Sequence, residues 1–319
     1  MKKTINVLSL LLMPALVWAA MPVSTFSIVG CDTATGELGV AVASKYFAVG
    51  AIVPWAKADV GAAATQSYVN PDYGIIGLEL LQQGLSPRQV IDSLTRADSM
   101  FERRQVGIID SRGRAANFTG AECLPWAGGR VGRHCAAQGN ILISGEVVDK
   151  MITAFENVTG ELSDKLLSAL LAGDTAGGDS RGRQSAALYV VRPGQWRRYD
   201  TKIDIRVDDS QDPFGELTRL YKMAKALSRL DQAYRLRMQG DLAGAVSAAK
   251  EAVELNANIP ETHYDYACYL SLSGQHDQAM RSLTTAIQMT PKFKAMAVGD
   301  SDLEALRGRD DFGRLMAEK

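Results

Sequence analysis

Thr25 is the residue with the clearest potential for chemistry, because it opens a β-prone run, Thr-Phe-Ser-Ile-Val-Gly, close to the start of the chain. A threonine that becomes the first residue of a chain can act as a nucleophile. Its hydroxyl attacks, and its own α-amine accepts the proton. An α-amine has a pKa of about 7.7–8.0, so it can serve as a base near neutral pH. The alternative is a threonine that simply starts an ordinary strand.

The first residues have the pattern of an export signal. Lys2 and Lys3 form a basic start, and residues 5–17 form an apolar stretch that is short for a membrane span. Cleavage after Ala19 fits the preference for small residues, and it leaves residues 20–24 ahead of Thr25. The sequence therefore predicts a signal peptide over 1–19 and a bacterial protein that is periplasmic or secreted. A second processing step is needed to free the Thr25 amine.

Charge excludes two classes of partner. The chain has 35 basic and 36 acidic residues, with no excess of positive charge for nucleic acid or an anionic membrane. After residues 1–19, no apolar stretch is long enough to cross a bilayer. We expect no nucleic-acid partner, no membrane association after signal cleavage, no cofactor and no metal.

Four cysteines raise the question of disulfides. Cys123 and Cys135 flank a Gly-rich segment, and in an oxidising compartment a bridge between them would be worth about 3 kcal/mol in the chain-entropy model. We predict that they lie close together and can form this bridge. With His134 the pair could instead bind zinc, although three ligands at irregular spacing are weak support. Cys31 and Cys268 are expected to be small buried side chains.

Patterning along the chain predicts a mixed region followed by a helical one. Ser86 and Pro87 mark a helix start, as N-cap and first helical residue. Runs of strands that alternate with pairs of helices suggest stacked sheets with helices outside. The predicted strands are Thr25–Cys31, Leu38–Ser44, Gly50–Lys57, Val60–Thr65, Arg104–Asp110, Ala115–Thr119, Ser185–Arg192 and Gln195–Asp200, and the predicted helices are Gly77–Gln83, Pro87–Arg96, Gly145–Asn157 and Leu162–Ala172.

The last third of the chain contains a repeat of 34 residues. A long helix is predicted over Pro213–Gly240, and small residues then recur at this spacing: Gly240 and Gly274, Ala233 and Ala267, Ala245 and Ala279, Ala252 and Ala286. The period and the small residues resemble the tetratricopeptide repeat, a helix–turn–helix unit, although the tryptophan of that pattern is missing. Two units cannot bury a core alone. We therefore expect the long helix and residues 295–316 to cap them, with Leu303, Leu306, Phe312 and Leu315 facing inward.

Successive segments of the first two thirds resemble one bacterial family. They are TFSIVGCDTATGELGVAVASKYFAVG, DVGAAATQ, NPDYGIIGLELLQQGLS, LPWAGGRVGRHCAAQGNIL and AGGDSRGRQSAALYVV, in this order. This text resembles domain-of-unknown-function family 1028, which is grouped with the N-terminal-nucleophile hydrolases, over about Thr25 to Asp209. The resemblance implies an α+β fold, an αββα sandwich of two stacked antiparallel sheets between helix layers. It also implies that Thr25 is the nucleophile at the start of a strand.

Such a nucleophile needs a nearby cation and donors for the developing oxyanion. Lys45 and Lys57 are the candidate cations, and the resemblance favours Lys57 because it falls on the third strand. Either lysine could instead be a solubilising charge at a strand end. Asn140 is a candidate oxyanion donor, or else part of the turn that begins a helix.

The loop 177–185 supplies the remaining candidates. The resemblance implies an acidic residue and a hydroxyl near the nucleophile here, which would be Asp179 and Ser185. Arg181 or Arg183 would meet a substrate carboxylate. Ser44 and Gln66 complete the predicted substrate-binding set, whereas Asp32 is interpreted as a turn former. An alternative for Asp179 is an ion pair with an arginine that only fixes the loop.

These observations predict three segments: a signal peptide (1–19), an N-terminal-nucleophile-hydrolase-like domain (20–209) and a helical tetratricopeptide-like domain (210–319). The predicted function is an exported amide-bond hydrolase that acts on a peptide or amide substrate and binds a peptide or protein through its repeats. The alternative is a non-catalytic periplasmic scaffold or binding protein with the same fold. A serine triad is disfavoured, because only three histidines are present and two of them, His263 and His276, lie in the repeats.

Overall fold

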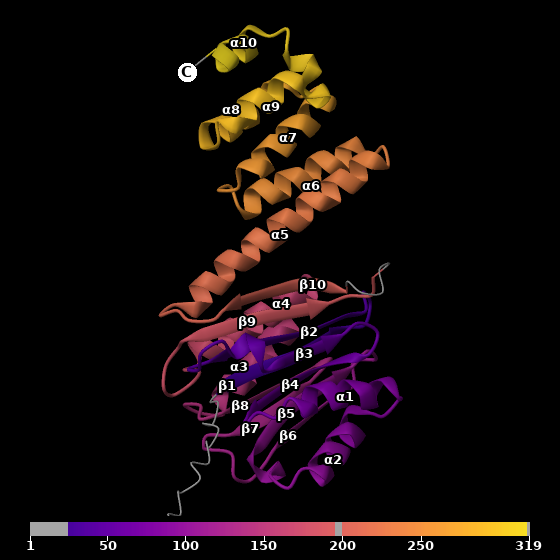
Figure 1. Ribbon diagram of the computed structural model, residues 1–319, viewed down its shortest axis with the longest axis vertical. Helices are drawn as coiled ribbons and strands as arrows, with labels where there is room; N and C mark the ends of the chain where they lie inside the picture. Colours follow the sequence, from indigo (N-terminus) through magenta and orange to yellow (C-terminus); the bar gives the residue numbers. More distant parts are fainter. Residues whose placement is uncertain (1–24, 195–199, 318–319) are drawn as a thin grey trace, which may run out of the picture.

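The computed structural model describes residues 25–194 and 200–317 (Figure 1). The predicted signal peptide and residues 20–24 lie outside the described residues. Within the described ranges, strands form two antiparallel sheets, and a region made only of helices follows them. No helix in these ranges has the length and apolar character needed to cross a membrane.

The larger sheet has six strands in the order β10-β9-β2-β1-β8-β7. Phe26 and Ile28 of β1 pack in the core beneath the helices, and Val29 and Cys31 pack in the core towards the second sheet. Both faces are buried, which explains why the run reads as nearly continuous apolar sequence. The strands are β1 (Thr25–Asp32), β2 (Glu37–Ser44), β7 (Gly128–Gly132), β8 (Cys135–Asn140), β9 (Ser185–Val191) and β10 (Thr201–Val207).

The smaller sheet has four strands in the order β3-β4-β5-β6 and faces the first sheet. Gly107 shows how closely the two sheets approach. A Cβ on this glycine would lie 2.1 Å from the Gln138 side-chain oxygen of the opposite sheet. The strands are β3 (Pro54–Lys57), β4 (Gly61–Ser67), β5 (Arg104–Asp110) and β6 (Ala115–Thr119).

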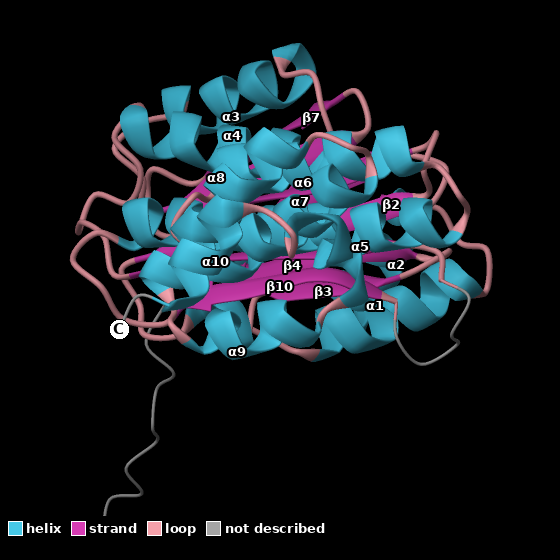
Figure 2. Ribbon diagram, turned by 90° about the horizontal axis from the view of Figure 1, so that it is seen from above, coloured by secondary structure: helices cyan, strands magenta, loops and turns pink. Residues whose placement is uncertain are grey.

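Helices cover the outer faces of the sheets (Figure 2). α3 (Glu146–Asn157) and α4 (Leu162–Thr175) pack on the six-stranded sheet, whereas α1 (Asp72–Gln82) and α2 (Pro87–Ala97) pack on the four-stranded sheet. The predicted start of α2 is confirmed: Ser86 forms a capping box with Gln89, and Pro87 is the first helical residue.

Among the described residues, six α-helices and one 3₁₀ helix, Ser301–Leu306, form the C-terminal region, and α5 lies across β10 before the others extend away from the sheets (Figure 1). Gly240 and Gly274 have left-handed φ angles of +83° and +77° in the turns that follow α5 and α7. A glycine meets this requirement without strain. The helices are α5 (Pro213–Met238), α6 (Leu242–Leu255), α7 (Pro260–Leu272), α8 (His276–Met289), α9 (Lys292–Gly299) and α10 (Asp310–Ala317).

The small residues of the 34-residue spacing line the cores of this region. Alanines 233, 245, 252, 267, 279 and 286 are all 0% exposed, so neighbouring helices approach closely at these points. The predicted inward-facing residues are confirmed as buried members of the core that α7 and α8 form; they are Leu303, Leu306, Phe312 and Leu315.

Ion pairs attach α5 to the first part of the molecule. Asp164 of α4 accepts hydrogen bonds from Lys225 at 2.6 Å and from Tyr221 at 2.7 Å. Glu161, at the start of α4, accepts from Arg229 at 2.9 Å. Burial opposes ionisation of Asp164, but the bonds from Lys225 and Tyr221 outweigh it and hold the pKa of this carboxyl below its usual value.

Several predicted elements differ from the structure. The hairpin of β7 and β8 was absent from the predicted strands. The run Gly50–Lys57 divides into a short 3₁₀ turn, Val49–Ala51, and β3. α1 begins at Asp72 instead of Gly77. The predicted strand Gln195–Asp200 is wrong at its end, because β10 begins at Thr201; residues 195–199 of that prediction lie outside the described residues.

The predicted disulfide is also wrong. All four cysteines are free and buried. Cys135 begins β8, whereas Cys123 lies beside the other end of this strand, next to Leu124, whose carbonyl accepts the Ile141 backbone N–H. Five residues of strand separate these two ends, which is about 17 Å. A disulfide allows no more than about 7 Å between Cα atoms, and the zinc alternative fails on the same separation. Cys31 and Cys268 are buried as predicted.

Candidate active site

Four polar side chains stand side by side at one end of the six-stranded sheet, one on each of four neighbouring strands. Thr25 of β1 pairs with Asn140 of β8, and Ser44 of β2 pairs with Ser185 of β9. The Thr25 hydroxyl donates to the Ser44 hydroxyl oxygen at 3.3 Å, which joins the two pairs. All four residues are at most 2% exposed. We refer to them as the polar row.

Two glutamines of the four-stranded sheet support the polar row. Gln66 of β4 donates to the Thr25 carbonyl at 3.1 Å and accepts the Ser27 hydroxyl at 2.6 Å. Gln105 of β5 accepts from Asn140 at 3.0 Å and from Gln66 at 2.8 Å. Both glutamines are fully buried. A buried amide is tolerated when its hydrogen bonds are made, so these bonds fix the geometry at this point.

Asp179 joins the loop before β9 to the end of β2. Its carboxylate accepts the backbone N–H of Lys45 at 2.8 Å and that of Arg181 at 2.9 Å. The Arg181 guanidinium pairs with the same carboxylate at 3.1 Å. The side chain of Asp179 is only 2% exposed, so the ion pair fixes the loop beside Ser44. This arrangement matches the structural alternative stated for Asp179.

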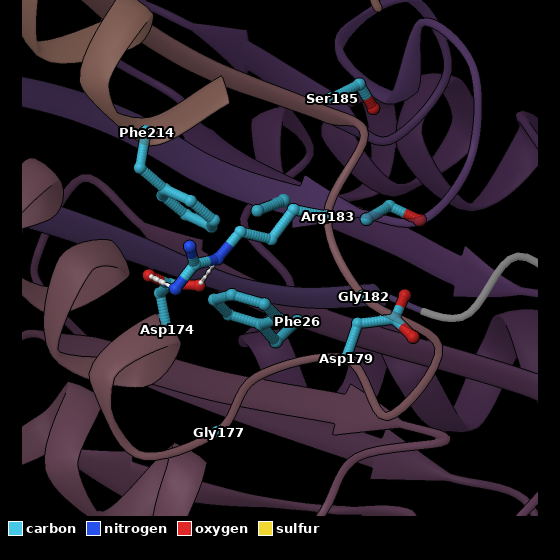
Figure 3. Close-up of a pocket in the computed structure, with 10 residues that line it drawn as sticks. Phe26, Asp174, Gly177, Asp179, Gly182, Arg183, Ser185 and Phe214 are labelled. Carbon is cyan, nitrogen blue, oxygen red and sulfur yellow. Dashed lines mark hydrogen bonds and ion pairs between the residues drawn. The ribbon is translucent and has the colours of Figure 1, made fainter. Parts of the chain in front are cut away.

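A pocket of about 150 Å³ opens next to the polar row (Figure 3). Ser44 and Ser185 belong to its lining, and Thr25 does not. Arg183 binds Asp174 through two hydrogen bonds of 2.7 and 2.8 Å, and its guanidinium lies over the Phe214 ring at 5.6 Å. Phe26 stacks on Phe214 at 6.2 Å between ring centroids. Because Phe214 lies in the first turn of α5, the C-terminal region contributes to this pocket.

Three of the five described non-glycine residues with left-handed φ angles lie at the same end of the sheets. Ala48, Ser67 and Ile141 have φ angles of +53°, +67° and +54°, a region that costs a non-glycine residue roughly 1–3 kcal/mol. Ile141 follows Asn140 directly. Its N–H donates to the Leu124 carbonyl and its carbonyl accepts the Ser180 N–H, which holds the end of β8 against the Asp179 loop.

The two candidate cations are separated by the fold. Lys45 follows Ser44 directly and donates its ammonium to the Arg183 carbonyl at 3.2 Å. Lys57 is on the third strand as predicted, but it pairs with Gly61 and donates to the Gln82 side chain. Gly61 is five residues along β4 from Gln66, which is about 17 Å from the Thr25 end. The prediction of Lys57 as a partner of Thr25 is therefore wrong. Of the two candidate lysines, Lys45 is the one near Thr25.

Two further predictions, those for Asn140 and Gln66, need correction. Asn140 does not form a turn at the start of a helix: it ends β8 and pairs with Thr25. Gln66 is not placed to bind substrate, because it is fully buried and its amide is bonded within the protein. Ser185 donates its hydroxyl to the Tyr46 carbonyl at 2.5 Å, which ties the chain after β2 to β9. Asp32 forms a turn as expected, accepting the Ala34 N–H at 2.9 Å.

Sequence reasoning missed Gln105, Gln138 and Phe214. The two glutamines carried a usable signal, since each has apolar or small residues beside it in a buried strand, where an unpaired polar group is costly. Phe214 carried none, because its role depends on where α5 docks.

Among the described residues, one group has the spacing of metal ligands: Cys268, Asp300 and Asp302 in the helical region. Tyr264 donates to Asp300 and Arg237 pairs with Asp302, so protein donors already occupy both carboxylates.

The family assignment rests on two comparisons. The sequence pattern described as Family of unknown function (DUF1028) matches residues 25–217. The chain belongs to this family. A crystal structure from Silicibacter pomeroyi, described as a DUF1028 protein, is similar at 31% identity with a TM-score of 0.58. The similarity covers 63% of this chain and 89% of that one. No match is found among curated proteins. The match begins at Thr25 and ends just after Phe214, so the DUF1028 region includes the polar row and the whole lining of the pocket.

Proposed function

We propose that this DUF1028 protein is an exported amide-bond hydrolase of the N-terminal-nucleophile type, with Thr25 as nucleophile. The observation that carries the proposal is the polar row. It sets a threonine at the first position of a central strand, with an amide on one side and a hydroxyl on the other. The αββα arrangement of N-terminal-nucleophile hydrolases is part of the proposal.

The chemistry needs Thr25 as the first residue of the mature chain. Its hydroxyl oxygen attacks the carbonyl carbon of the substrate amide, and its α-amine takes the hydroxyl proton and passes it to the leaving amine. An ester on Thr25 results, and water hydrolyses it. The Asn140 side-chain amide stabilises the oxyanion, and the Lys45 ammonium keeps the α-amine neutral at lower pH by its positive charge.

The helical region is assigned a binding role. We propose that α5–α8 form tetratricopeptide-like units that hold a peptide or protein, while Arg183 meets a carboxylate of the substrate at the pocket. The expected location, a periplasm or the exterior of a bacterial cell, gives such a hydrolase access to exported peptides.

A second function, a non-catalytic scaffold or binding protein, is favoured by one observation. Thr25 is 0% exposed, and residues 1–24 precede it in the sequence. If that segment stays attached, Thr25 has no free amine and the hydrolase lacks its base.

The deciding experiment measures the intact mass of the exported protein and its hydrolysis of a panel of peptide amides. The hydrolase proposal expects a chain that starts at Thr25, with activity abolished in Thr25→Ala and partly kept in Thr25→Ser, because serine retains a hydroxyl. A chain that still starts at Ala20 after days, together with no activity, would favour the scaffold.

A further inference from the structure

Amide side chains connect the two sheets directly beneath Thr25. Gln66 and Gln105 pair across β4 and β5, and their side chains join at 2.8 Å. The free ends of this unit reach two different partners in the other sheet: Gln66 holds the Thr25 carbonyl, and Gln105 holds the Asn140 amide. One rigid unit therefore contacts both the proposed nucleophile, Thr25, and the proposed oxyanion donor, Asn140.

The anchoring of Gln105 makes the unit rigid. Its Nε2 donates to the Gly139 carbonyl at 2.8 Å and to the Thr119 hydroxyl at 2.9 Å. With Nε2 fixed, Oε1 can face only one way, towards Asn140 and Gln66. Apolar side chains of the same volume would fill this interior without the cost of burying amides. The location of the amides, below Thr25 and Asn140, calls for a function beyond packing.

We propose that Gln66 and Gln105 are positioning residues that fix the Thr25 backbone and the Asn140 side-chain amide for the reaction. The inference rests on the proposed function, since it concerns the same nucleophile. Gln105 accepts one amide hydrogen of Asn140, and this fixes the plane of the Asn140 amide group and with it the direction of the second hydrogen. Gln66 fixes the strand that carries the nucleophile.

Gln138 provides a matched control inside the same interior. It is fully buried, and its amide donates to the Ser27 hydroxyl at 2.6 Å. Among the described residues, neither Thr25 nor Asn140 is a hydrogen-bond partner of the Gln138 side chain. Replacing Gln138 therefore disturbs the packing between the sheets without removing the proposed positioning contacts.

The test measures acylation of a chain released with Thr25 as its first residue, using a β-lactone that forms an ester with the hydroxyl as its ring opens. Gln66→Met and Gln105→Met should lower the limiting acylation rate about tenfold or more, with half-saturating probe concentration unchanged. Gln138→Met should stay within about twofold of the parent, even where urea unfolding shows a similar loss of stability. Equal losses in all three variants would overturn the inference.

A charged variant keeps the test decisive if the methionine variants do not fold. In Gln66→Glu, an ionised carboxylate cannot donate to the Thr25 carbonyl, whereas the protonated acid can. Because burial favours the protonated acid, the acylation rate of this variant relative to the parent should rise as the pH falls from 8 to 5. A ratio that does not change with pH contradicts a positioning role for Gln66.

A measurement that does not depend on acylation separates this inference from the proposed function. In nuclear magnetic resonance spectra of protein labelled with ¹⁵N at asparagine, the Asn140 side-chain amide protons should exchange slowly with water. This protection should be lost in Gln105→Met and kept in Gln138→Met. If the parent protein is not acylated, the proposed function is contradicted, but the positioning role is not. Unchanged protection in Gln105→Met would remove the positioning role whether or not the parent reacts.

Discussion

At the scale of single residues, the distance between the two sheets depends on the size of the side chains that face the buried amides. Gly107 of β5 lies against the Gln138 side chain, where a Cβ would come within 2.1 Å of the amide oxygen and 2.7 Å of the nitrogen. Fully buried amides have little room to move, because their rotation would break hydrogen bonds. A single methyl group at this position is therefore a sensitive probe of the interior.

Gly107→Ala should lower the free energy of unfolding by about 1–3 kcal/mol through overpacking. Gly77→Ala is the control: it is also buried, but its Cβ would meet nothing closer than 3.7 Å, and alanine favours the helix that contains it. Urea unfolding measures both variants. Equal stability of Gly107→Ala and the parent would contradict the described spacing of the sheets.

The cysteines give a second residue-scale prediction. Burial raises the pKa of the Cys135 thiol to about 12, so the native protein has almost no thiolate at pH 8. Iodoacetamide should label Cys135 slowly in the native protein. In denaturant without reductant, mass spectrometry should find label on every cysteine. Failure of Cys123 and Cys135 to label under those conditions would restore the disulfide that the structure rejects.

Sequence patterns predicted several site residues but not their contacts. Thr25 and Ser44 stand at the ends of strands that composition marks well, and Asp179 lies in the loop before another strand, so their meeting at one end of the sheet could be expected. Lys57 was misplaced because a strand has two ends and the sequence does not say which end approaches Thr25. The roles of Gln66 and Gln105 depend on the opposite sheet, which local patterning does not describe.

At the scale of elements, α5 belongs to both parts of the molecule. Its first turn contributes Phe214 to the pocket, its middle binds α4 through Lys225, and Ala233 packs in the helical core. The boundary predicted at residue 210 therefore falls just before a helix whose contacts lie on both sides, and the family match extends to residue 217. The β7–β8 hairpin was missed for a different reason, since its glycines and alanines give little hydrophobic alternation.

Asp164→Asn should weaken the attachment of α5 and lower the free energy of unfolding by about 2 kcal/mol at pH 7, because the Lys225 ammonium loses its partly buried charged partner. Glu216→Gln is the control on the same helix, since its pair with Arg219 is exposed and should contribute nothing measurable. The folded-state pKa of Asp164 is depressed, so its contribution is present above about pH 4 and disappears as the pH falls through the folded-state value. The difference between parent and Asp164→Asn should therefore be smaller at pH 3 than at pH 7. A difference that is the same at both pH values would contradict this role.

At the scale of the whole molecule, the helical region depends on its flanking elements. A fragment of residues 240–290 lacks α5 and the four buried residues Leu303, Leu306, Phe312 and Leu315, so it cannot close its core. Circular dichroism should show this fragment largely unfolded, whereas a fragment of residues 213–317 should be helical and melt cooperatively. Cooperative melting of the shorter fragment would show that the flanking elements are dispensable.

The central claim is that Thr25 reacts once it begins the chain, and a mass measurement tests it most directly. A protein released with Thr25 as its first residue is treated with the β-lactone, digested and sequenced by tandem mass spectrometry. The account predicts one adduct, an ester on the Thr25 hydroxyl, that is absent from Thr25→Ala and from a chain that retains residues 20–24. An unmodified Thr25, or an adduct that persists in Thr25→Ala, would contradict it.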